Sequence, residues 1–272
     1  MTGYRRSIRL LAWMAVFAAV CFRPAASVAG EAAPRVSWRV AAEHPHDPEA
    51  FTQGLLWRDG SLYESTGLYG RSSLRRVDPA TGRALARRDL PADYFGEGIA
   101  AHDGRLFLLT WRENVVFVFD AATRDALGQK HLPTEGWGIC QEGASFVVSD
   151  GTSALRRYDA ETFTPRERIR VTDGGAPVDW LNELECVDGR ILANVWGTDR
   201  VAVIDPANGH VLAWIDLSGL RGFLPRLPQE AVTNGLAYDP ATGRLWVTGK
   251  LWPKIFELAV DRLPPVGGKE TP

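Results

Sequence analysis

The chain is poor in the residues from which metal and thiol sites are built. Its 272 residues include 3 cysteines, 5 histidines and 2 methionines, and no cysteine or histidine stands at a zinc-ligand spacing. His44 and His46 lie close together, but no third ligand accompanies them. Cys140 and Cys186 could form one bridge in an oxidising compartment, although we favour two buried thiols. The sequence therefore predicts no metal site.

An excess of positive charge is also missing, as are the short motifs of several large enzyme classes. Lys and Arg number 31 against 33 Asp and Glu, for a net charge of −2. Nucleic acid is therefore excluded as a partner, because its phosphates are bound by a basic excess. No Gly-x-Ser-x-Gly turn and no glycine-rich phosphate loop is present, which disfavours serine hydrolases and nucleotide enzymes.

Long hydrophobic runs are missing except at the N-terminus. Arg5, Arg6 and Arg9 precede an apolar run over residues 10–22, and small residues follow as far as Ala29. This pattern is typical of a secretory signal, and the run is too short for a membrane span. We expect a signal peptide over residues 1–29, export to the periplasm or the medium, and a mature chain without membrane contact.

The sequence is rich in turn residues, short strand-like runs and tryptophan. It has 27 Gly, 17 Pro and 10 Trp. In each unit, two strand-like runs are separated by a polar turn with a glycine. A third and a fourth run follow this pair, except that the last unit lacks the fourth. The turn glycines recur 39 to 54 residues apart and are Gly60, Gly104, Gly143, Gly189 and Gly243. Four short strands per unit of this length are typical of β-propeller blades.

Five such units account for residues 30–272 as a single all-β domain. The fifth unit lacks its fourth strand, whereas residues 35–40, ahead of the first unit, have no other partner. We therefore expect a five-bladed β-propeller whose ring is closed by the N-terminal strand of the mature chain. This closure would remove the exposed edge that an open sheet carries.

Equivalent positions of the five units should meet around the central channel, because the first strand of each blade lines it. A first ring, ahead of the apolar pair in each first strand, consists of Gln53, Glu97, Trp137, Asn182 and Asn234. A second ring, beyond each second strand, consists of Gly67, Trp111, Gly151, Trp196 and Lys250.

These rings place a few polar groups within aromatic walls, as small-ligand pockets do. In the first ring, only Glu97 can transfer a proton near neutral pH. Phe95 and the indoles would raise the pKa of Glu97 by removing water, whereas Lys250 would lower it.

Several strings of the sequence are long and unusual. They are HPHDP at 44–48, FTQGL at 51–55, ESTGLYGRSS at 64–73, YFGEG at 94–98, GWG at 136–138, SDGTS at 149–153, LNELE at 181–185 and TGKLWP at 248–253. In these strings the chain resembles the plant-type (papaya-like) glutaminyl-peptide cyclotransferases, over about residues 44–258. The resemblance implies a five-bladed propeller that converts the N-terminal glutamine of peptides or proteins to pyroglutamate with release of ammonia, without zinc.

The resemblance also implies roles for individual residues. Glu97, which follows Phe-Gly, matches the proton-transfer residue and would act as general acid and base. The lysine and asparagine of the family's site match Lys250 and Asn182, and our hypothesis is that these two act as catalytic residues that steady the developing oxyanion, together with an indole N–H. The implied substrate-binding residues are Phe51, Gln53, Phe95, Trp111, Trp137 and Trp196.

No cofactor is required on this interpretation, and the expected state is a monomer. The channel could hold a structural ion such as calcium, although the sequence shows no ligand set for one. Two alternatives stay open. One is a non-catalytic exported propeller that binds peptides or glycans between its indoles. The other is a metal-dependent lactonase or similar hydrolase on a related propeller.

Overall fold

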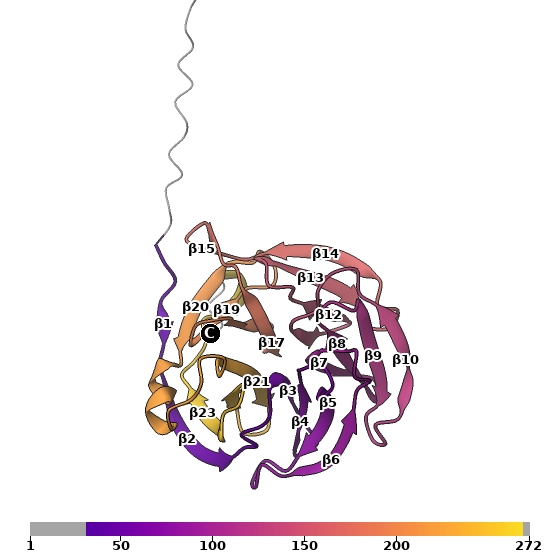
Figure 1. Cartoon of the computed structure of the whole chain (residues 1–272). Helices are drawn as coiled ribbons and strands as arrows, with labels where there is room; N and C mark the ends of the chain where they lie inside the picture. Colours follow the sequence, from indigo (N-terminus) through magenta and orange to yellow (C-terminus); the bar gives the residue numbers. More distant parts are fainter. Residues whose placement is uncertain (1–30, 269–272) are drawn as a thin grey trace, which may run out of the picture.

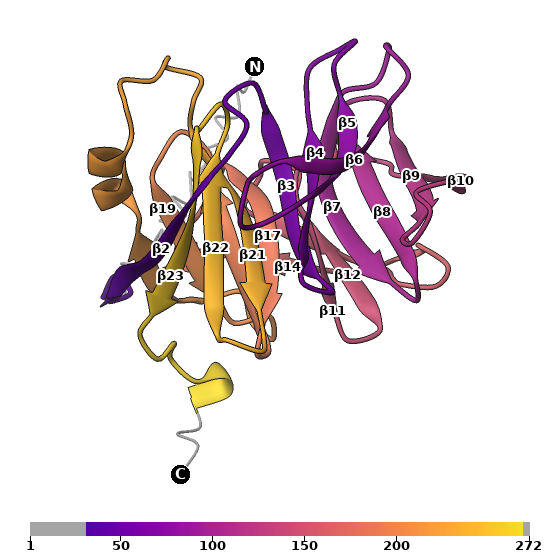
Figure 2. The same ribbon diagram turned by 90° about the horizontal axis from the view of Figure 1, so that it is seen from below.

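The computed structural model describes residues 31–268, which form a ring of five antiparallel sheets, the blades of a β-propeller (Figure 1). The first strands of the blades contact one another around the axis of the ring. Figure 2 shows the ring from the side, with the first strands running from one face toward the other. The predicted five-bladed all-β fold is confirmed.

Each blade contains four strands in chain order from the axis outward, except that the outermost strand of the fifth blade comes from the N-terminal side. The first two blades consist of β3 (Thr52–Arg58), β4 (Ser61–Thr66), β5 (Ser73–Val77), β6 (Ala84–Asp89), and β7 (Gly96–His102), β8 (Arg105–Thr110), β9 (Val115–Asp120), β10 (Ala126–His131). The third and fourth consist of β11 (Ile139–Glu142), β12 (Ser145–Val148), β13 (Ala154–Asp159), β14 (Pro165–Arg170), and β17 (Leu181–Val187), β18 (Arg190–Val195), β19 (Arg200–Ile204), β20 (Val211–Asp216). The fifth consists of β21 (Thr233–Asp239), β22 (Arg244–Gly249), β23 (Lys254–Val260) and β2 (Trp38–Pro45). Outside the blades lie β15 (Thr172–Asp173), β16 (Ala176–Pro177) and the 3₁₀ turns η1 (Ser218–Phe223) and η2 (Val266–Gly268).

The ring is closed by β2, which pairs antiparallel with β23 of the last blade. The closing segment begins later than the residues 35–40 that the sequence indicated. Arg35 and Val36 form β1, which instead pairs parallel with the outer edge of β20 in the fourth blade (Figure 1). The strands β1 and β2 therefore cover the outer edges of two neighbouring blades.

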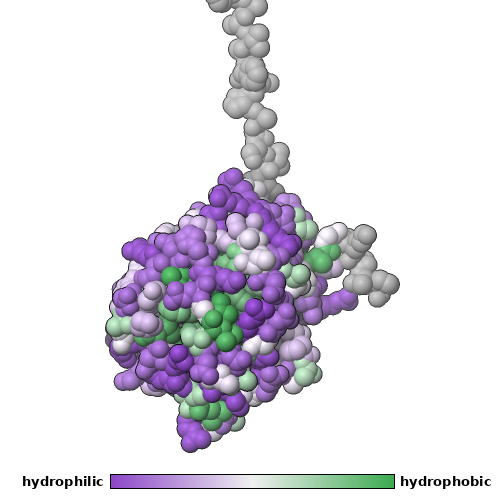
Figure 3. Space-filling model, turned by 90° about the vertical axis from the view of Figure 1, so that its right-hand side faces the viewer, coloured by the Kyte–Doolittle hydropathy of each residue, from purple (hydrophilic) through white to green (hydrophobic). Residues whose placement is uncertain are grey.

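The hydrophobic core is divided into five clusters, one at each interface between neighbouring blades. Between the second and third blades, for example, the rings of Phe107 and Phe146 lie 4.7 Å apart. The outer strands β10 and β14 are largely exposed, and the side of the molecule in Figure 3 is accordingly hydrophilic over most of its area. Burial is thus greatest between blades, and this packing fixes the positions of the inner strands.

One buried carboxylate ties three blades together inside the channel. Glu183, on β17, accepts hydrogen bonds from the backbone N–H groups of Leu55 in the first blade (3.3 Å) and Leu236 in the fifth (2.9 Å). Burial raises the pKa of Glu183 well above its usual range, and neighbouring Glu185 raises it further.

A disulfide joins the inner strands of the third and fourth blades. Cys140 of β11 and Cys186 of β17 are bonded, with their Cα atoms 5.5 Å apart. The interpretation that we favoured from the sequence, two unbonded thiols, is therefore wrong. Because the two cysteines are 46 residues apart in the sequence, their spacing gave no sign that two blades would bring them into contact.

Replacing both Cys140 and Cys186 with serine should lower the free energy of unfolding by about 2–4 kcal/mol, because the bridge closes a long loop in the unfolded chain. Urea unfolding of the wild type and the double variant measures this difference. The wild type in reducing agent should resemble the variant. If reduction leaves its stability unchanged, the bridge is not present in solution.

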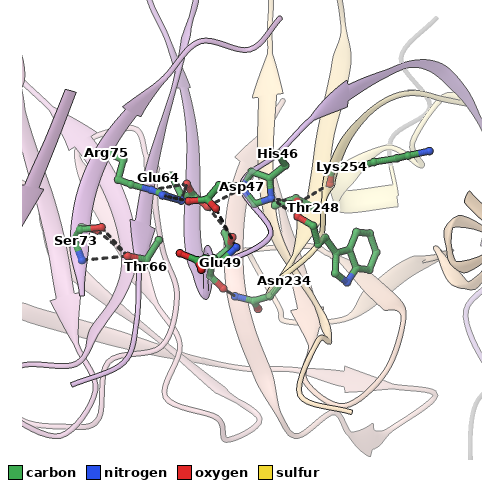
Figure 4. A network of polar contacts seen from close by, with 12 residues as sticks. His46, Asp47, Glu49, Glu64, Thr66, Ser73, Arg75, Asn234, Thr248 and Lys254 are labelled. Carbon is green, nitrogen blue, oxygen red and sulfur yellow. Dashed lines mark hydrogen bonds and ion pairs between the residues drawn. The ribbon is translucent and has the colours of Figure 1, made fainter. Parts of the chain in front are cut away.

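A buried polar cluster joins the last blade to the first (Figure 4). Glu64, on β4, accepts hydrogen bonds from His46, Thr52 and Arg75 at 2.7–3.1 Å. The other ring nitrogen of His46 lies 2.7 Å from the carbonyl oxygen of Trp252, in the last blade. We call these residues the seam cluster, because they lie where the ring closes.

Within the seam cluster, the Glu64 carboxyl is negatively charged near neutral pH. Burial alone would raise the pKa of this carboxyl, but His46, Arg75 and Thr52 together lower it to about 2. Arg75 also pairs with Asp47 at 2.6 Å. His46 and Asp47, in the loop after β2, thus contribute to ring closure rather than to metal binding.

The predicted signal peptide over residues 1–29 lies outside the described residues. Within residues 31–268 the structure contains no helix long and apolar enough to cross a membrane.

Candidate active site

A cavity of about 910 Å³ lies at the face where the first strands begin. All nine residues that the sequence proposed as catalytic or substrate-binding line it. They are Phe51, Gln53, Phe95, Glu97, Trp111, Trp137, Asn182, Trp196 and Lys250. They come from all five blades. The prediction that they lie together therefore depends on the alignment of all five units.

The first-ring residues occupy irregular positions of the inner strands. In four blades the pairing of the first and second strands shifts register at the ring position: between Thr52 and Gly54, Gly96 and Ile99, Leu181 and Leu184, and Thr233 and Leu236. A β-bulge turns a side chain away from its normal alternation and is common beside active sites. The bulges therefore explain how Gln53, Glu97 and Asn182 line the cavity. Asn234 is not among the residues that line the cavity and instead contacts Gln53.

The residues of the second ring follow the ends of the second strands. Aromatic rings occupy the space beside its two glycines. A Cβ atom on Gly67 would lie 2.3 Å from Cε1 of Phe95, and one on Gly151 would lie 2.8 Å from Cζ2 of Trp137. Both distances are far below van der Waals contact. The gaps in the ring thus allow Phe95 and Trp137 to pack as walls of the cavity.

Glu97 lies at the polar floor of the cavity, with 5% of its surface exposed. The side-chain amide of Gln53 donates a hydrogen bond to Oε1 of Glu97 at 3.0 Å, and Asn234 donates to the backbone carbonyl of Gln53 at 3.2 Å. Burial raises the pKa of Glu97 well above its ordinary value; Lys250 opposes this rise, and Glu113 and Glu135 add to it. Of the two opposing effects that the sequence suggested, desolvation is the larger.

Lys250 and Asn182 are also buried, with 6% and 3% of their surfaces exposed. Burial lowers the pKa of Lys250, although the charge of Glu97 opposes this shift, and its Nζ lies 4.8 Å from the centre of the Phe51 ring. Oδ1 of Asn182 has no hydrogen-bond partner in the described part of the chain. An unpaired buried acceptor is costly, so this oxygen is suited to bind an N–H group of a ligand.

A third ring of residues, which the sequence analysis did not identify as a ring, also lines the cavity. Its members lie two positions ahead of the first ring and are Phe51, Phe95, Glu135, Trp180 and Val232. In four blades the carbonyl group at this position accepts the backbone N–H of the second-ring residue of the same blade, at 2.8–3.0 Å. The resemblance had supplied Phe51 and Phe95. The same offset in the other blades was a sequence signal for Glu135 and Trp180.

Glu135 holds two of the tryptophan walls in place. Its Oε2 accepts the indole N–H groups of Trp111 (2.9 Å) and Trp137 (3.1 Å), and its Oε1 pairs with Arg112 (3.0 Å). The guanidinium of Arg112 stacks over the Trp111 ring at 3.7 Å. These two indole N–H groups are thus occupied, and Lys250 is the cationic donor among the nine predicted residues.

In the described part of the chain, a group of three potential metal ligands lies away from the cavity. Among the residues that the structure describes, one group of three potential ligands has its ligand atoms within 4.8 Å of one another: His102, Asp103 and Glu161. His102 ends β7, whereas Glu97 lies near its start, so this group is at the opposite end of the blade.

Comparison with known proteins identifies the family of this chain. The sequence model of the glutamine cyclotransferase family matches residues 12–260. A glutaminyl-peptide cyclotransferase of Arabidopsis thaliana is 43% identical over 227 residues, which cover 82% of this chain and 71% of that protein. The crystal structure of Myxococcus xanthus glutaminyl cyclase superposes with a TM-score of 0.80 at 35% identity, covering 85% of this chain and 100% of that one. The chain therefore belongs to the glutamine cyclotransferase family.

Proposed function

We propose that the chain converts the N-terminal glutamine of peptides and proteins to pyroglutamate, with release of ammonia, and that Glu97 transfers the proton. Membership of the glutamine cyclotransferase family supports the reaction. The position of Glu97 supports its role, because this carboxyl lies among aromatic walls and burial raises its pKa well above the ordinary value. A general acid and base works best when its pKa lies near the working pH.

The reaction is intramolecular. The neutral α-amine attacks the γ-carboxamide carbon of the same residue, so a new C–N bond forms while the carbonyl oxygen gains negative charge. Glu97 accepts the proton from the attacking nitrogen and delivers it to the carboxamide nitrogen. The old C–N bond then breaks and ammonia leaves. Holding the glutamine in a curled conformation supplies a further part of the acceleration.

The neighbouring groups have complementary roles in this scheme. The Lys250 ammonium stabilises the charge on the oxygen, as a preorganised donor in a water-poor site. The unpaired Oδ1 of Asn182 accepts an N–H of the substrate, which differs from the oxyanion-donor role that we expected from the sequence. Gln53 orients the Glu97 carboxylate through its hydrogen bond. The aromatic rings exclude water from the substrate side chain.

Mass spectrometry of a glutamine-initiated peptide incubated with the purified mature chain tests this function. We expect a mass loss that corresponds to one ammonia, and none from the same peptide with an acetylated N-terminus, because its nitrogen cannot attack. If the free peptide binds without losing ammonia, the chain is a binding propeller and the proposal is wrong.

We also infer that residues 1–29 direct export and are removed, and that residues 30–272 then act as one monomeric domain. The disulfide supports an oxidising compartment, where such bonds persist. Sequencing of the N-terminus of the exported protein should begin near Gly30. Light scattering should give the mass of one mature chain.

Removing the Glu135 side chain should reduce cyclisation, since two walls of the cavity depend on it. We expect Glu135→Ala to lower kcat/KM by about tenfold, because Trp111 and Trp137 each lose a hydrogen bond to a charged acceptor. Glu135→Gln keeps an oxygen acceptor and should recover most of the loss.

The pH dependence separates this positioning role from general loss of structure. The charge of Glu135 raises the pKa of Glu97. Glu135→Gln should therefore move the acidic limb of the kcat/KM profile to lower pH. An unchanged limb, or equal loss in both variants, would contradict the role.

A further inference from the structure

Trp180 is held in an unfavourable backbone conformation at the edge of the cavity. Its φ is +65°, in the left-handed region, where a bulky residue is a genuine outlier. Such strain costs roughly 1–3 kcal/mol and persists only where the surroundings enforce it, often at ligand sites. Backbone hydrogen bonds enforce it here: Trp180 N–H donates to Gly151 (2.8 Å), and Trp196 N–H donates to Trp180 (2.8 Å).

The side chain of Trp180 remains exposed despite this strain. Its exposed fraction is 53%, and that of Trp196 is 43%, compared with 5% for Glu97 at the floor. The Trp180 ring lies 5.5 Å from that of Trp196 and 6.3 Å from that of Trp137. Trp180 and Trp196 thus form an aromatic rim, which continues inward through Trp137. No described feature of the core requires an indole at this exposed position.

The cavity is also larger than one glutamine requires. Pockets of about 300–1,000 Å³ enclose ligands of drug size, and this cavity is near the upper end, at about 910 Å³. The reacting carboxamide must lie beside Glu97 at the floor. The rest of a peptide must therefore leave past the exposed rim.

We propose that Trp180, with Trp196, binds the side chain of the residue that follows the N-terminal glutamine, and that this subsite favours an aromatic ring. The assignment rests on the proposed function. Stacked or edge-to-face aromatic pairs contribute beyond their buried area, and a half-exposed indole offers a face for such a pair. Trp180 is then a substrate-binding residue that sets specificity outside the reacting centre.

Three amides test the subsite: glutaminamide, Gln-Gly-amide and Gln-Phe-amide. The wild type should cyclise Gln-Phe-amide with a kcat/KM roughly tenfold above that for glutaminamide, because one aromatic pair is worth about that factor. Trp180→Gly should remove most of this ratio, chiefly through KM for Gln-Phe-amide. Trp180→Phe should preserve it, because a ring remains.

Stability supplies the readout that distinguishes binding from structure. Glycine adopts φ near +65° without strain, so Trp180→Gly should not lower the thermal midpoint. The matched control is Arg124→Gly, since Arg124 has the same φ of +65° in the turn between β9 and β10, away from the cavity. This control should leave the ratio of kcat/KM for Gln-Phe-amide to kcat/KM for glutaminamide unchanged.

The outcomes separate this inference from the proposed function. If the wild type releases no ammonia from any of the three amides, the proposed function fails and the subsite with it. If the wild type is active but its ratio survives in Trp180→Gly, only the subsite is wrong. A lower thermal midpoint with equal losses on all amides would make Trp180 a structural residue and would also overturn the subsite.

Discussion

Replacing Glu97 with glutamine should reduce kcat for cyclisation by about 10²–10⁴-fold, the usual contribution of a positioned proton-transfer group. Glutamine has nearly the same shape and can still pair with Gln53, whose amide donates to Oε1 of Glu97 at 3.0 Å. It cannot accept the proton of the attacking amine. The fold should persist, because Glu97→Gln removes a carboxyl whose burial is unfavourable in its charged form.

The pH profile identifies the lost group. The pKa of Glu97 is raised, so the carboxyl gains a proton, and the wild-type kcat/KM falls, as the pH decreases through that raised value. The substrate amine titrates at roughly 7.7–8.0, but its limb should remain in Glu97→Gln, whereas the limb of Glu97 should vanish.

The matched control for Glu97 is Glu161→Gln. Glu161 is an exposed acid close to His102, at the opposite end of β7. This variant should retain wild-type turnover in the same ammonia-release assay. Near-normal turnover of Glu97→Gln itself would exclude the carboxyl as the proton shuttle.

The fold and most of the cavity could be predicted from one property of the sequence, the alignment of its five units. Residues that occupy the same place in each unit must meet around the axis, whatever their separation in the chain. Glu97 and Lys250 are 153 positions apart in the sequence, yet both line one cavity. The members of the first ring could be identified without knowing that β-bulges occur at these positions.

What could not be predicted depends on contacts between units. The pairing of Cys140 with Cys186 follows from the close approach of two inner strands, which the alignment does not measure. Likewise, the ring offset indicates that Glu135 lines the cavity, but not that its carboxylate accepts hydrogen bonds from two indoles. The strain at Trp180 is a property of φ, and a tryptophan in a loop gives no sequence signal for it.

The strand that closes the ring was also only partly predictable from the sequence. The sequence indicated that a segment before the first unit must complete the last blade, and β2 does so. The division between β1 and β2 was not visible, because an alternating strand of this kind can pair with either of two outer edges. Glu64 and Arg75 face each other on the paired strands β4 and β5. The seam cluster was missed because His46 joins Glu64 to the last blade only after closure.

Replacing Glu64 with glutamine should lower the free energy of unfolding by about 3–5 kcal/mol near pH 7, because it removes one partner of a buried ion pair. The Arg75 side chain is only 5% exposed and would keep Asp47 as its partner, whose own side chain is 37% exposed. A guanidinium left in this position is poorly compensated. The loss should weaken the seam where the last blade meets the first.

The pH dependence of this loss has a defined sign. The pKa of Glu64 is about 2 in the folded chain, against 4.5 as its ordinary value. A lowered pKa contributes stability that is present above pH 4.5 and is lost as the pH falls toward 2. The difference between the wild type and Glu64→Gln should therefore be largest near neutral pH and shrink in acid.

Urea unfolding at several pH values measures this difference, and Glu257→Gln is the matched control. Glu257 pairs with His44 at 2.7 Å between β23 and β2, but both side chains are about one-fifth exposed. Its loss should cost under about 1 kcal/mol, because water still reaches this pair and weakens it. If both variants lose equally little, or if the effect of Glu64→Gln does not vary with pH, ring closure depends on strand pairing and apolar packing rather than on the charged seam cluster.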